Sequence, residues 1–279
     1  MITHKKTKNG FAYIEIVNKN ACARVALQGA HLFHYRQQDK NPLLWLSEKS
    51  FFENDKAIRG GIPICWPWFG KHKTDPDLPQ HGFARTSLWT LVETEEPDEF
   101  STELLFQLEN SPDTLKLWPH QFKLQLRVMV SSTLQLNLTT KNCSTESFEI
   151  SSALHSYFAV HDIDTVFIEG LDNCSYFDAL TKEIKTQKGN IYIREEIDRV
   201  YQNVPPRLTL HDQERSVQIR SQGSSSAVVW NPWIEKSARM GDMIQDAYKN
   251  MLCIETANAL TDAQNIGPGD DHTVIVIIF

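Results

Sequence analysis

Hydrophobic and polar residues alternate with a period of two along most of this chain. The clearest case runs from Phe122 to Asn142, where apolar residues occupy every second position on both sides of the Ser131-Ser132-Thr133 segment. A strand with one buried face has this period, because successive side chains point to opposite sides of a sheet. The pattern therefore predicts an antiparallel hairpin with one buried face.

Shorter alternating runs predict further strands. They span 12–17, 23–27, 43–46, 104–108, 148–154, 165–168, 217–220, 227–230 and 274–279. The best helical candidate is the segment 236–250, which is short and contains Gly241. Half-buried strands need a second sheet to cover their apolar faces, so we predict an all-β antiparallel sandwich. No internal repeat or interdomain linker interrupts the pattern, and we expect a single domain over residues 1–279.

The composition and net charge limit the classes of molecule that this protein is expected to bind. The chain has 279 residues, of which 41% are hydrophobic and 23% are charged, enough to bury a large core. The net charge of −7 and the scattered basic residues predict neither nucleic-acid nor membrane-surface binding. No apolar run approaches the roughly 20 residues of a membrane span, and the five widely spaced cysteines suit reduced thiols. We expect a cytoplasmic protein and a monomer.

Two polar loops carry side chains suited to a ligand. Arg59 stands beside Gly60-Gly61, where the backbone can approach a ligand and a guanidinium can bind a carboxylate or phosphate. A loop arginine alone is more often solvated or ion-paired. After a polar loop at 71–79, Gln80 and His81 suit sugar hydroxyls, and Arg85 could join Arg59 around an anion. The simpler reading of this second segment is a turn followed by a strand.

Aromatic residues near these loops could form flat surfaces for a sugar ring, although most aromatics in a sandwich belong to its core. Trp230-Asn231-Pro232-Trp233 reads as a strand end that opens into a loop. Lys236 follows and could supply a third cation for a phosphorylated ligand, although a lone loop lysine is usually solvated. The other aromatic candidates are Trp66, Trp68 and Phe69.

His155 and Glu255 are the sharpest catalytic candidates, because each is the one ionisable residue in an apolar, strand-like run. A charge loses hydration there unless it is paired, hydrogen-bonded or facing a ligand. The structural alternative is a core histidine bonded to a carbonyl and a glutamate paired with an arginine. Asp198 could orient a histidine or a sugar hydroxyl, or belong to an exposed charged face.

Other site types find less support. His31 and His34 would not share a strand face, and no His-Glu-x-x-His motif is present, so we expect no metal site. The sequence has no Gly-x-Gly-x-x-Gly opening a helix, no phosphate-binding P-loop and no Gly-x-Ser-x-Gly elbow. We therefore expect no nucleotide cofactor and no serine nucleophile.

The order of these motifs resembles the D-hexose-6-phosphate mutarotases, or glucose-6-phosphate 1-epimerases, a branch of the aldose 1-epimerase superfamily. The resemblance covers roughly Arg59 to Gly269. It implies a galactose-mutarotase-like supersandwich, a cofactor-free site on the concave face, and a substrate phosphate held by arginines. It also implies His155 and Glu255 as the catalytic pair. The segments that carry it are Arg59-Gly60-Gly61-Ile62-Pro63, Trp66-Pro67-x-Phe69-Gly70, Gln80-His81-Gly82-Phe83-Ala84-Arg85, Leu154-His155-Ser156-Tyr157-Phe158, Asp198-Arg199-Val200-Tyr201, Val229-Trp230-Asn231-Pro232 and Cys253-Ile254-Glu255.

The resemblance also implies substrate contacts at Arg59, Gln80, Arg85 and Asp198. The residue chemistry agrees, since exchange of hexose 6-phosphate anomers needs an acid at the ring oxygen and a base at the C1 hydroxyl. We expect His155 to be the acid and Glu255 the base. Three alternatives stay open: a carbohydrate-binding module without activity, an epimerase of unphosphorylated hexoses, and a glycoside hydrolase, which usually needs two carboxylates.

Overall fold

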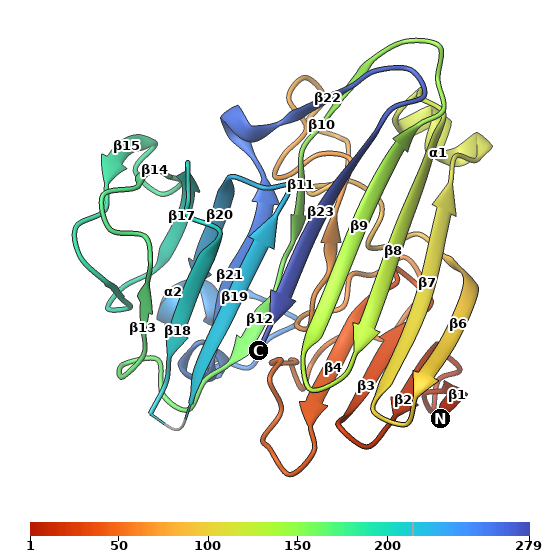
Figure 1. Cartoon of the computed structure of the whole chain (residues 1–279). Helices are drawn as coiled ribbons and strands as arrows, with labels where there is room; N and C mark the ends of the chain where they lie inside the picture. Colours follow the sequence, from red (N-terminus) through yellow and green to blue (C-terminus); the bar gives the residue numbers. More distant parts are fainter. Residues whose placement is uncertain (214) are drawn as a thin grey trace.

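The computed structural model describes residues 1–213 and 215–279. These residues form antiparallel β-sheets, and the largest two pack face to face as a sandwich (Figure 1). The all-β prediction is confirmed. Figure 1 shows the nine-stranded sheet in front, running from β18 and β19 to β6, with β17, β20 and β21 of the second large sheet behind it.

The nine-stranded sheet has the order β16-β13-β18-β19-β23-β9-β8-β7-β6. It contains the predicted hairpin as β8 and β9, whose register pairs Phe122 with Asn142 and Val130 with Leu134. The strands, in chain order, are β6 (Thr90–Asp98), β7 (Ser101–Glu109), β8 (Phe122–Val130), β9 (Leu134–Asn142), β13 (Phe167–Glu169), β16 (Ile191–Tyr192), β18 (Arg207–His211), β19 (Ser216–Gln222) and β23 (Asp271–Ile278).

The eight-stranded sheet has the order β15-β14-β17-β20-β21-β11-β5, and β12 also pairs with β21. β20 and β21 are buried at every position. The strands are β5 (Ile64–Cys65), β11 (Ser152–Leu154), β12 (Tyr157–Ala159), β14 (Ser175–Asp178), β15 (Glu183–Thr186), β17 (Ile197–Gln202), β20 (Ser226–Asn231) and β21 (Met251–Asn258).

Two smaller sheets and short helices complete the described part of the chain. The first four strands form one sheet in sequence order, and β10 pairs with β22. The helix α1 begins with a capping box at Ser111. These elements are β1 (Ile2–Lys6), β2 (Ala12–Val17), β3 (Ala21–Ala26), β4 (Leu32–Gln37), β10 (Phe148–Ile150), β22 (Gln264–Ile266), α1 (Pro112–Leu117), α2 (Trp233–Arg239) and the 3-10 turns η1 (Ala247–Asn250) and η2 (Leu260–Asp262).

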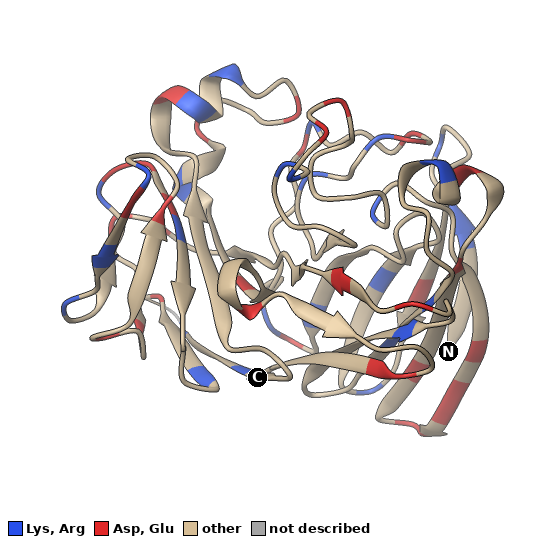
Figure 2. Ribbon diagram, turned by 90° about the horizontal axis from the view of Figure 1, so that it is seen from above, with Lys and Arg blue, Asp and Glu red and all other residues tan. Residues whose placement is uncertain are grey.

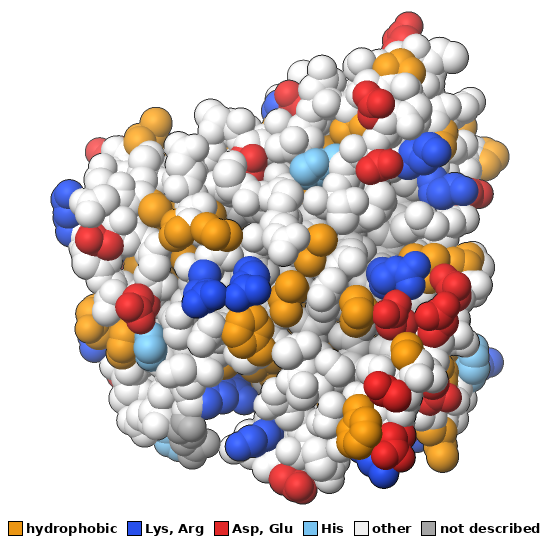
Figure 3. All heavy atoms as spheres, viewed as in Figure 1, with side chains coloured by type: hydrophobic (Ala, Val, Ile, Leu, Met, Phe, Trp, Pro, Cys, Tyr) orange, Lys and Arg blue, Asp and Glu red, His pale blue; other side chains and the backbone are white. Residues whose placement is uncertain are grey.

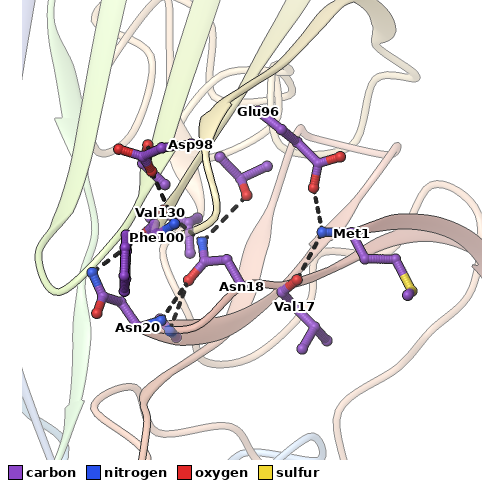
Figure 4. A network of polar contacts seen from close by, with 11 residues as sticks. Met1, Val17, Asn18, Asn20, Glu96, Asp98, Phe100 and Val130 are labelled. Atoms are coloured by element: carbon purple, nitrogen blue, oxygen red, sulfur yellow. Dashed lines mark hydrogen bonds and ion pairs between the residues drawn. The ribbon is translucent and has the colours of Figure 1, made fainter.

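Polar contacts fasten the N-terminal sheet to the edge of the nine-stranded sheet (Figure 4). The amide of Asn18 donates to the carbonyl of Val130 at 2.9 Å, and that of Asn20 donates to the carbonyl of Phe100 at 3.2 Å. The Met1 ammonium bonds Glu96. Because these partners come from β6, the turn between β6 and β7, and the last residue of β8, the small sheet is held against the large one.

The core lies between the two large sheets. One continuous cluster of buried side chains includes Leu124 and Leu126 of β8 together with Val229 of β20 and Ile254 of β21. On β21, Leu252 and Ile254 therefore face this core. Cys253 and Glu255, which alternate with these two residues, must point to the opposite side of the sheet, because side chains alternate along a strand.

Two sequence predictions need correction. The predicted helix at 236–250 is instead α2, which ends at Arg239, followed by a loop and η1. The backbone leaves the helix at Met240, and the Ser237 hydroxyl bonds the carbonyls of Ile244 and Gln245, which holds the loop in place. The predicted strand at 43–46 forms isolated bridges, one to Phe158 and one to Gly60.

Charges are dispersed over the molecule. In the ribbon of Figure 2, basic and acidic residues are interspersed along the chain, including the helices and long loops. On the face drawn in Figure 3, which the nine-stranded sheet dominates, lysines and arginines stand beside acidic and apolar side chains. Within the described residues, no helix has the length and apolar character needed to cross a membrane.

Candidate active site

The strand register lines up side chains across the face of the eight-stranded sheet that points away from the core. Asp198 pairs with Trp230, Trp230 with Cys253, and Cys253 with Tyr157. Two residues further along the same strands, Val200 pairs with Val228 and Val228 pairs with Glu255. Residues that pair directly across strands point to the same face. Four strands that are far apart in sequence therefore supply one surface around Glu255.

The next row gives that surface an apolar floor of small side chains. Ala257 of β21 pairs with Ala153 of β11, which pairs in turn with Cys65 of β5. These residues form a buried cluster with Val200 and Val228. Glu255 therefore borders a region that offers no counter-charge and little hydration.

His155 sits at a break between two strands. β11 and β12 both pair with β21, and the intervening residues His155 and Ser156 leave the regular ladder. The amide of His155 donates to the carbonyl of Pro63, and the carbonyl of Ser156 accepts from Ile254. This break lets the imidazole stack on the ring of Tyr157, two residues later, with centroids 4.7 Å apart and planes 10° apart.

The structure brings His155 and Glu255 into direct contact. Nε2 of His155 lies 3.3 Å from Oε1 of Glu255, and the two residues are 8% and 2% exposed. Among the described residues, Nδ1 of His155 and Oε2 of Glu255 are buried polar atoms without a hydrogen-bond partner. Buried polar atoms are nearly always paired, so these two atoms leave unused hydrogen-bonding capacity at the pair.

Burial disfavours charge on both members of the pair. It lowers the pKa of His155 well below the ordinary value, and the nearby guanidinium groups of Arg59 and Arg85 lower it further. Burial also raises the pKa of Glu255 well above the ordinary value, and Asp198 adds to this effect while Arg85 opposes it. Burial therefore favours the neutral form of both groups, a protonated Glu255 and an uncharged imidazole.

Arg59 is held by two side chains that the sequence did not single out. Its Nε donates to Oδ2 of Asp242 at 2.9 Å, and its Nη1 donates to the hydroxyl of Tyr157 at 2.9 Å. Tyr157 could have been found from the sequence, because it lies two residues from His155 in the same run. Asp242 could not, because its link to Arg59 spans 183 residues.

The segment with Gln80, His81 and Arg85 folds back on itself. The Arg85 guanidinium donates to the carbonyl of Gln80 at 2.8 Å, and Nδ1 of His81 accepts from the amide of Gly70. The His81 ring lies edge-on to His155, with centroids 6.2 Å apart. Burial lowers the pKa of His81 to about 3, so it is a neutral hydrogen-bonding group at physiological pH.

Asp198, Trp230 and Lys236 form the opposite side of the site. The Trp230 ring stands edge-on to His155 at 6.0 Å, and the Lys236 ammonium lies 5.7 Å above the centre of that indole ring. Lys236 bonds Glu196 at 3.0 Å and lies 3.9 Å from Asp198. Two carboxylates therefore offset its charge. Burial raises the pKa of Asp198, and Lys236 counteracts this.

Several other candidates have structural roles. Trp66 is 0% exposed, donates to Thr140 and packs in the core, so it cannot stack on a ligand. Gly60 packs closely against the chain itself, because a Cβ there would lie 2.5 Å from the carbonyl of Trp45. Trp68 bonds the carbonyl of Pro79 through its indole N–H.

Two aromatics end up near the functional residues. Phe69 packs edge-on against His81 at 5.0 Å and borders the apolar floor beside Glu255. Trp233 begins α2 and packs on Tyr248, with ring centroids 5.2 Å apart. Phe69 therefore supports His81, while Trp233 supports the packing of α2.

The histidines at 31 and 34 are separated as the alternation predicts. His31 is buried and bonds the carbonyl of Gly60, while His34 contacts Cys22. In the part of the chain that the structure describes, no three His, Cys, Asp or Glu side chains are grouped to hold a metal ion. A cavity of about 670 Å³ lies elsewhere, between β4, the residues after β12 and the end of β23, and none of the candidate site residues lines it.

The fold and the site define a sugar-epimerase type of β-sandwich. The model of the aldose 1-epimerase family matches residues 13–278, and the chain belongs to this family. It is therefore an enzyme of the isomerase class.

Individual relatives support the assignment to this family. The chain is 36% identical over 279 residues to a protein of Cenchrus ciliaris provisionally named glucose-6-phosphate 1-epimerase, covering 95% of this chain and 84% of that protein. A relative from Escherichia coli K12 with the same provisional name is 39% identical over 241 residues, which are 85% of this chain and 80% of the relative.

Solved structures share the fold. The crystal structure of a protein from Salmonella typhimurium, provisionally called a mutarotase, matches with a TM-score of 0.93 and 33% identity, over 99% of this chain and 92% of that one. A galactose mutarotase-like protein from Lactobacillus casei matches with a TM-score of 0.74 at 16% identity, over 95% of this chain and 99% of that one, and it supports the fold alone. The predicted galactose-mutarotase-like architecture is confirmed.

Proposed function

We propose that this enzyme interconverts the α and β anomers of a hexose 6-phosphate, with glucose 6-phosphate as the first substrate to test. The observation that carries the proposal is the buried contact of 3.3 Å between His155 and Glu255, with Arg59 and Arg85 close enough to lower the pKa of the histidine. The provisional names of the relatives from Cenchrus ciliaris and Escherichia coli support the same substrate.

The reaction needs one proton donor and one proton acceptor. Ring opening breaks the bond between C1 and the ring oxygen, which gains a proton, while the C1 hydroxyl loses a proton and becomes the aldehyde oxygen. His155 donates to the ring oxygen and Glu255 accepts from the C1 hydroxyl. Rotation about the bond between C1 and C2, followed by the reverse transfers, closes the ring to the other anomer and restores both groups.

One shared proton is enough for this cycle. In the empty site Glu255 carries the proton, and its transfer to Nε2 of His155 yields an imidazolium donor and a carboxylate acceptor without changing the total charge. Each positioned proton transfer typically contributes on the order of 10² to 10⁴ in rate. The pair is therefore sufficient for a reaction that is already facile in water.

Different residues around the catalytic pair bind different parts of the sugar phosphate. We assign the phosphate to Arg59 and Arg85, because a guanidinium binds phosphate through several parallel N–H groups. Asp198 holds a sugar hydroxyl, and the Trp230 ring offers an apolar face to the sugar. The remaining polar contacts come from Gln80 and His81 on one side of the site and from Lys236 on the other.

The phosphate assignment predicts selective losses. Replacing Arg59 or Arg85 by alanine should raise KM for glucose 6-phosphate by about tenfold or more, the loss expected for hydrogen bonds between charged groups, and change KM for glucose little. Anomer exchange measured by NMR magnetisation transfer gives both constants. Arg127→Ala serves as the control, because this arginine pairs with Glu103 on the nine-stranded sheet. Equal increases in KM for both sugars would show that neither arginine binds the phosphate.

The same measurements decide between the alternatives. Binding of glucose 6-phosphate without faster anomer exchange would show a carbohydrate-binding module and end the proposal. Equal efficiency on glucose and glucose 6-phosphate would favour an epimerase of free hexoses. The proposal includes no metal or organic cofactor, and we expect activity to survive chelation by EDTA. We also expect a cytosolic monomer, consistent with the free thiols of all five cysteines.

A further inference from the structure

The clamp on Arg59 connects the proposed phosphate site to the catalytic histidine. Asp242 fixes the guanidinium through Nε, and Tyr157 fixes it through Nη1. A guanidinium has five N–H groups, so three are left for an anion after these two bonds. The Arg59 side chain is 25% exposed, which keeps those groups within reach of a ligand.

Tyr157 transmits the position of Arg59 to His155. The phenol is 1% exposed and lies between two rings: it stacks on His155 at 4.7 Å and on Trp45 at 5.8 Å. Burial raises the pKa of Tyr157, so it remains a neutral phenol that accepts from Arg59. The distance between the guanidinium charge and the imidazole is therefore set by one rigid aromatic ring.

The charged groups around the imidazole make the proton affinity of His155 depend on its distance from Arg59. His155 faces the neutral His81 ring, the rings of Tyr157 and Trp230, and Glu255, and its proton affinity is reduced by both Arg59 and Arg85. Tyr157 bonds Arg59 and stacks on His155, which places the guanidinium charge on the imidazole side of the pair, where it disfavours the imidazolium. An anion that neutralises Arg59 therefore favours transfer of the shared proton from Glu255 to His155.

We propose that Tyr157 and Asp242 are positioning residues that clamp Arg59 beside the catalytic pair, so that a bound phosphate dianion activates His155 as the acid in addition to anchoring the sugar. This inference rests on the proposed function. It makes the phosphate a part of the catalytic machinery, which is a use of remote binding energy at the reacting centre. A sugar without a phosphate should then react slowly, and a separate phosphate-like dianion should restore part of the rate.

The test separates the dianion from the sugar. Anomer exchange of glucose is measured by NMR magnetisation transfer with and without sodium phosphite at matched ionic strength, and enzyme-free samples correct for catalysis by phosphite itself. The natural protein should accelerate glucose exchange at least tenfold when phosphite is added. The pH at which His155 becomes protonated, read from the pH profile of the rate, should rise with phosphite.

Tyr157→Phe keeps the ring stack and removes the hydroxyl, and Asp242→Asn keeps the shape and removes the charge. Each should reduce the activation by phosphite about tenfold and weaken the shift of the pH profile, as expected for the loss of one hydrogen bond to a charged group. Asp246→Asn is the matched control, because this exposed carboxylate of the same loop bonds Lys249 and does not contact Arg59. It should keep the full activation.

Each outcome has a distinct meaning. If glucose 6-phosphate exchange is catalysed but phosphite does not accelerate glucose exchange, the coupling is wrong and the proposed function stands. If glucose 6-phosphate exchange is not catalysed, the proposed function itself fails. Full activation by phosphite in both Tyr157→Phe and Asp242→Asn would overturn the clamp. Thermal unfolding checks the fold, and Tyr157→Phe alone decides the question if Asp242→Asn does not fold.

Discussion

Replacing Glu255 by glutamine separates the chemistry of the buried pair from its packing. The substitution keeps the size of the side chain, whose Oε1 lies 3.3 Å from Nε2 of His155. It removes the ability to accept the proton of the C1 hydroxyl. The variant therefore tests the proposed base directly.

The expected loss is large. A general base typically contributes 10² to 10⁴ in rate, equivalent to about 3–5 kcal/mol of transition-state stabilisation. Glu255→Gln should lower kcat for glucose 6-phosphate by this factor after subtraction of the spontaneous reaction, as measured by NMR magnetisation transfer. Glu149→Gln is the control, because its carboxylate is exposed on β10 and pairs with Lys73. Exchange by Glu255→Gln within about threefold of the natural protein would refute the proton-transfer mechanism.

The same substitution, which lowers activity, should raise the stability of the fold relative to the natural protein as the pH rises. The pKa of Glu255 is raised from 4.5 by burial, so below pH 4.5 the carboxyl is protonated in both the folded and the unfolded chain and costs nothing. As the pH rises above 4.5, the unfolded chain ionises before the folded chain does, and stability is lost. Glu255→Gln avoids this loss. Its free energy of unfolding should therefore gain on that of the natural protein as the pH rises to 7, which urea unfolding can measure.

Two further predictions concern the fold. Gly82→Ala should lower the free energy of unfolding by about 2–4 kcal/mol, because its Cβ would lie 2.0 Å from the carbonyl of Trp66 at a φ of +69°; Gly10→Ala, with no atom within 4 Å, should lose about 1 kcal/mol. A similar loss in both variants, measured by urea unfolding, would contradict the close-approach argument. Burial lowers the pKa of His31 from 6.5 to about 4, so its neutral form stabilises the fold above pH 6.5 and this stability is lost as the pH falls toward 4. The loss is about 2 kcal/mol between pH 6.5 and 5, and His31→Gln should flatten this part of the profile. An unchanged pH slope in that variant would count against His31 as the cause.

The periodicity predicted local structure well wherever one face of a strand is buried. The hairpin at 122–142 appears as β8 and β9 because alternation fixes which face is covered. The prediction failed at 43–46 and 236–250, where neighbours far away in sequence decide the backbone. In the second segment, α2 ends at Arg239 and the following loop delivers Asp242 to Arg59.

The amino-acid sequence was enough to predict a β-sandwich and to single out His155 and Glu255, because an ionisable group in an apolar run is costly without a partner. It did not determine that the two side chains touch, which depends on the pairing of β21 with both β11 and β12 and on the break between these strands. The clamp of Asp242 and Tyr157 on Arg59 also exists only in the tertiary structure. Contacts between residues about a hundred or more positions apart depend on how whole sheets pack, and no local periodicity records that packing.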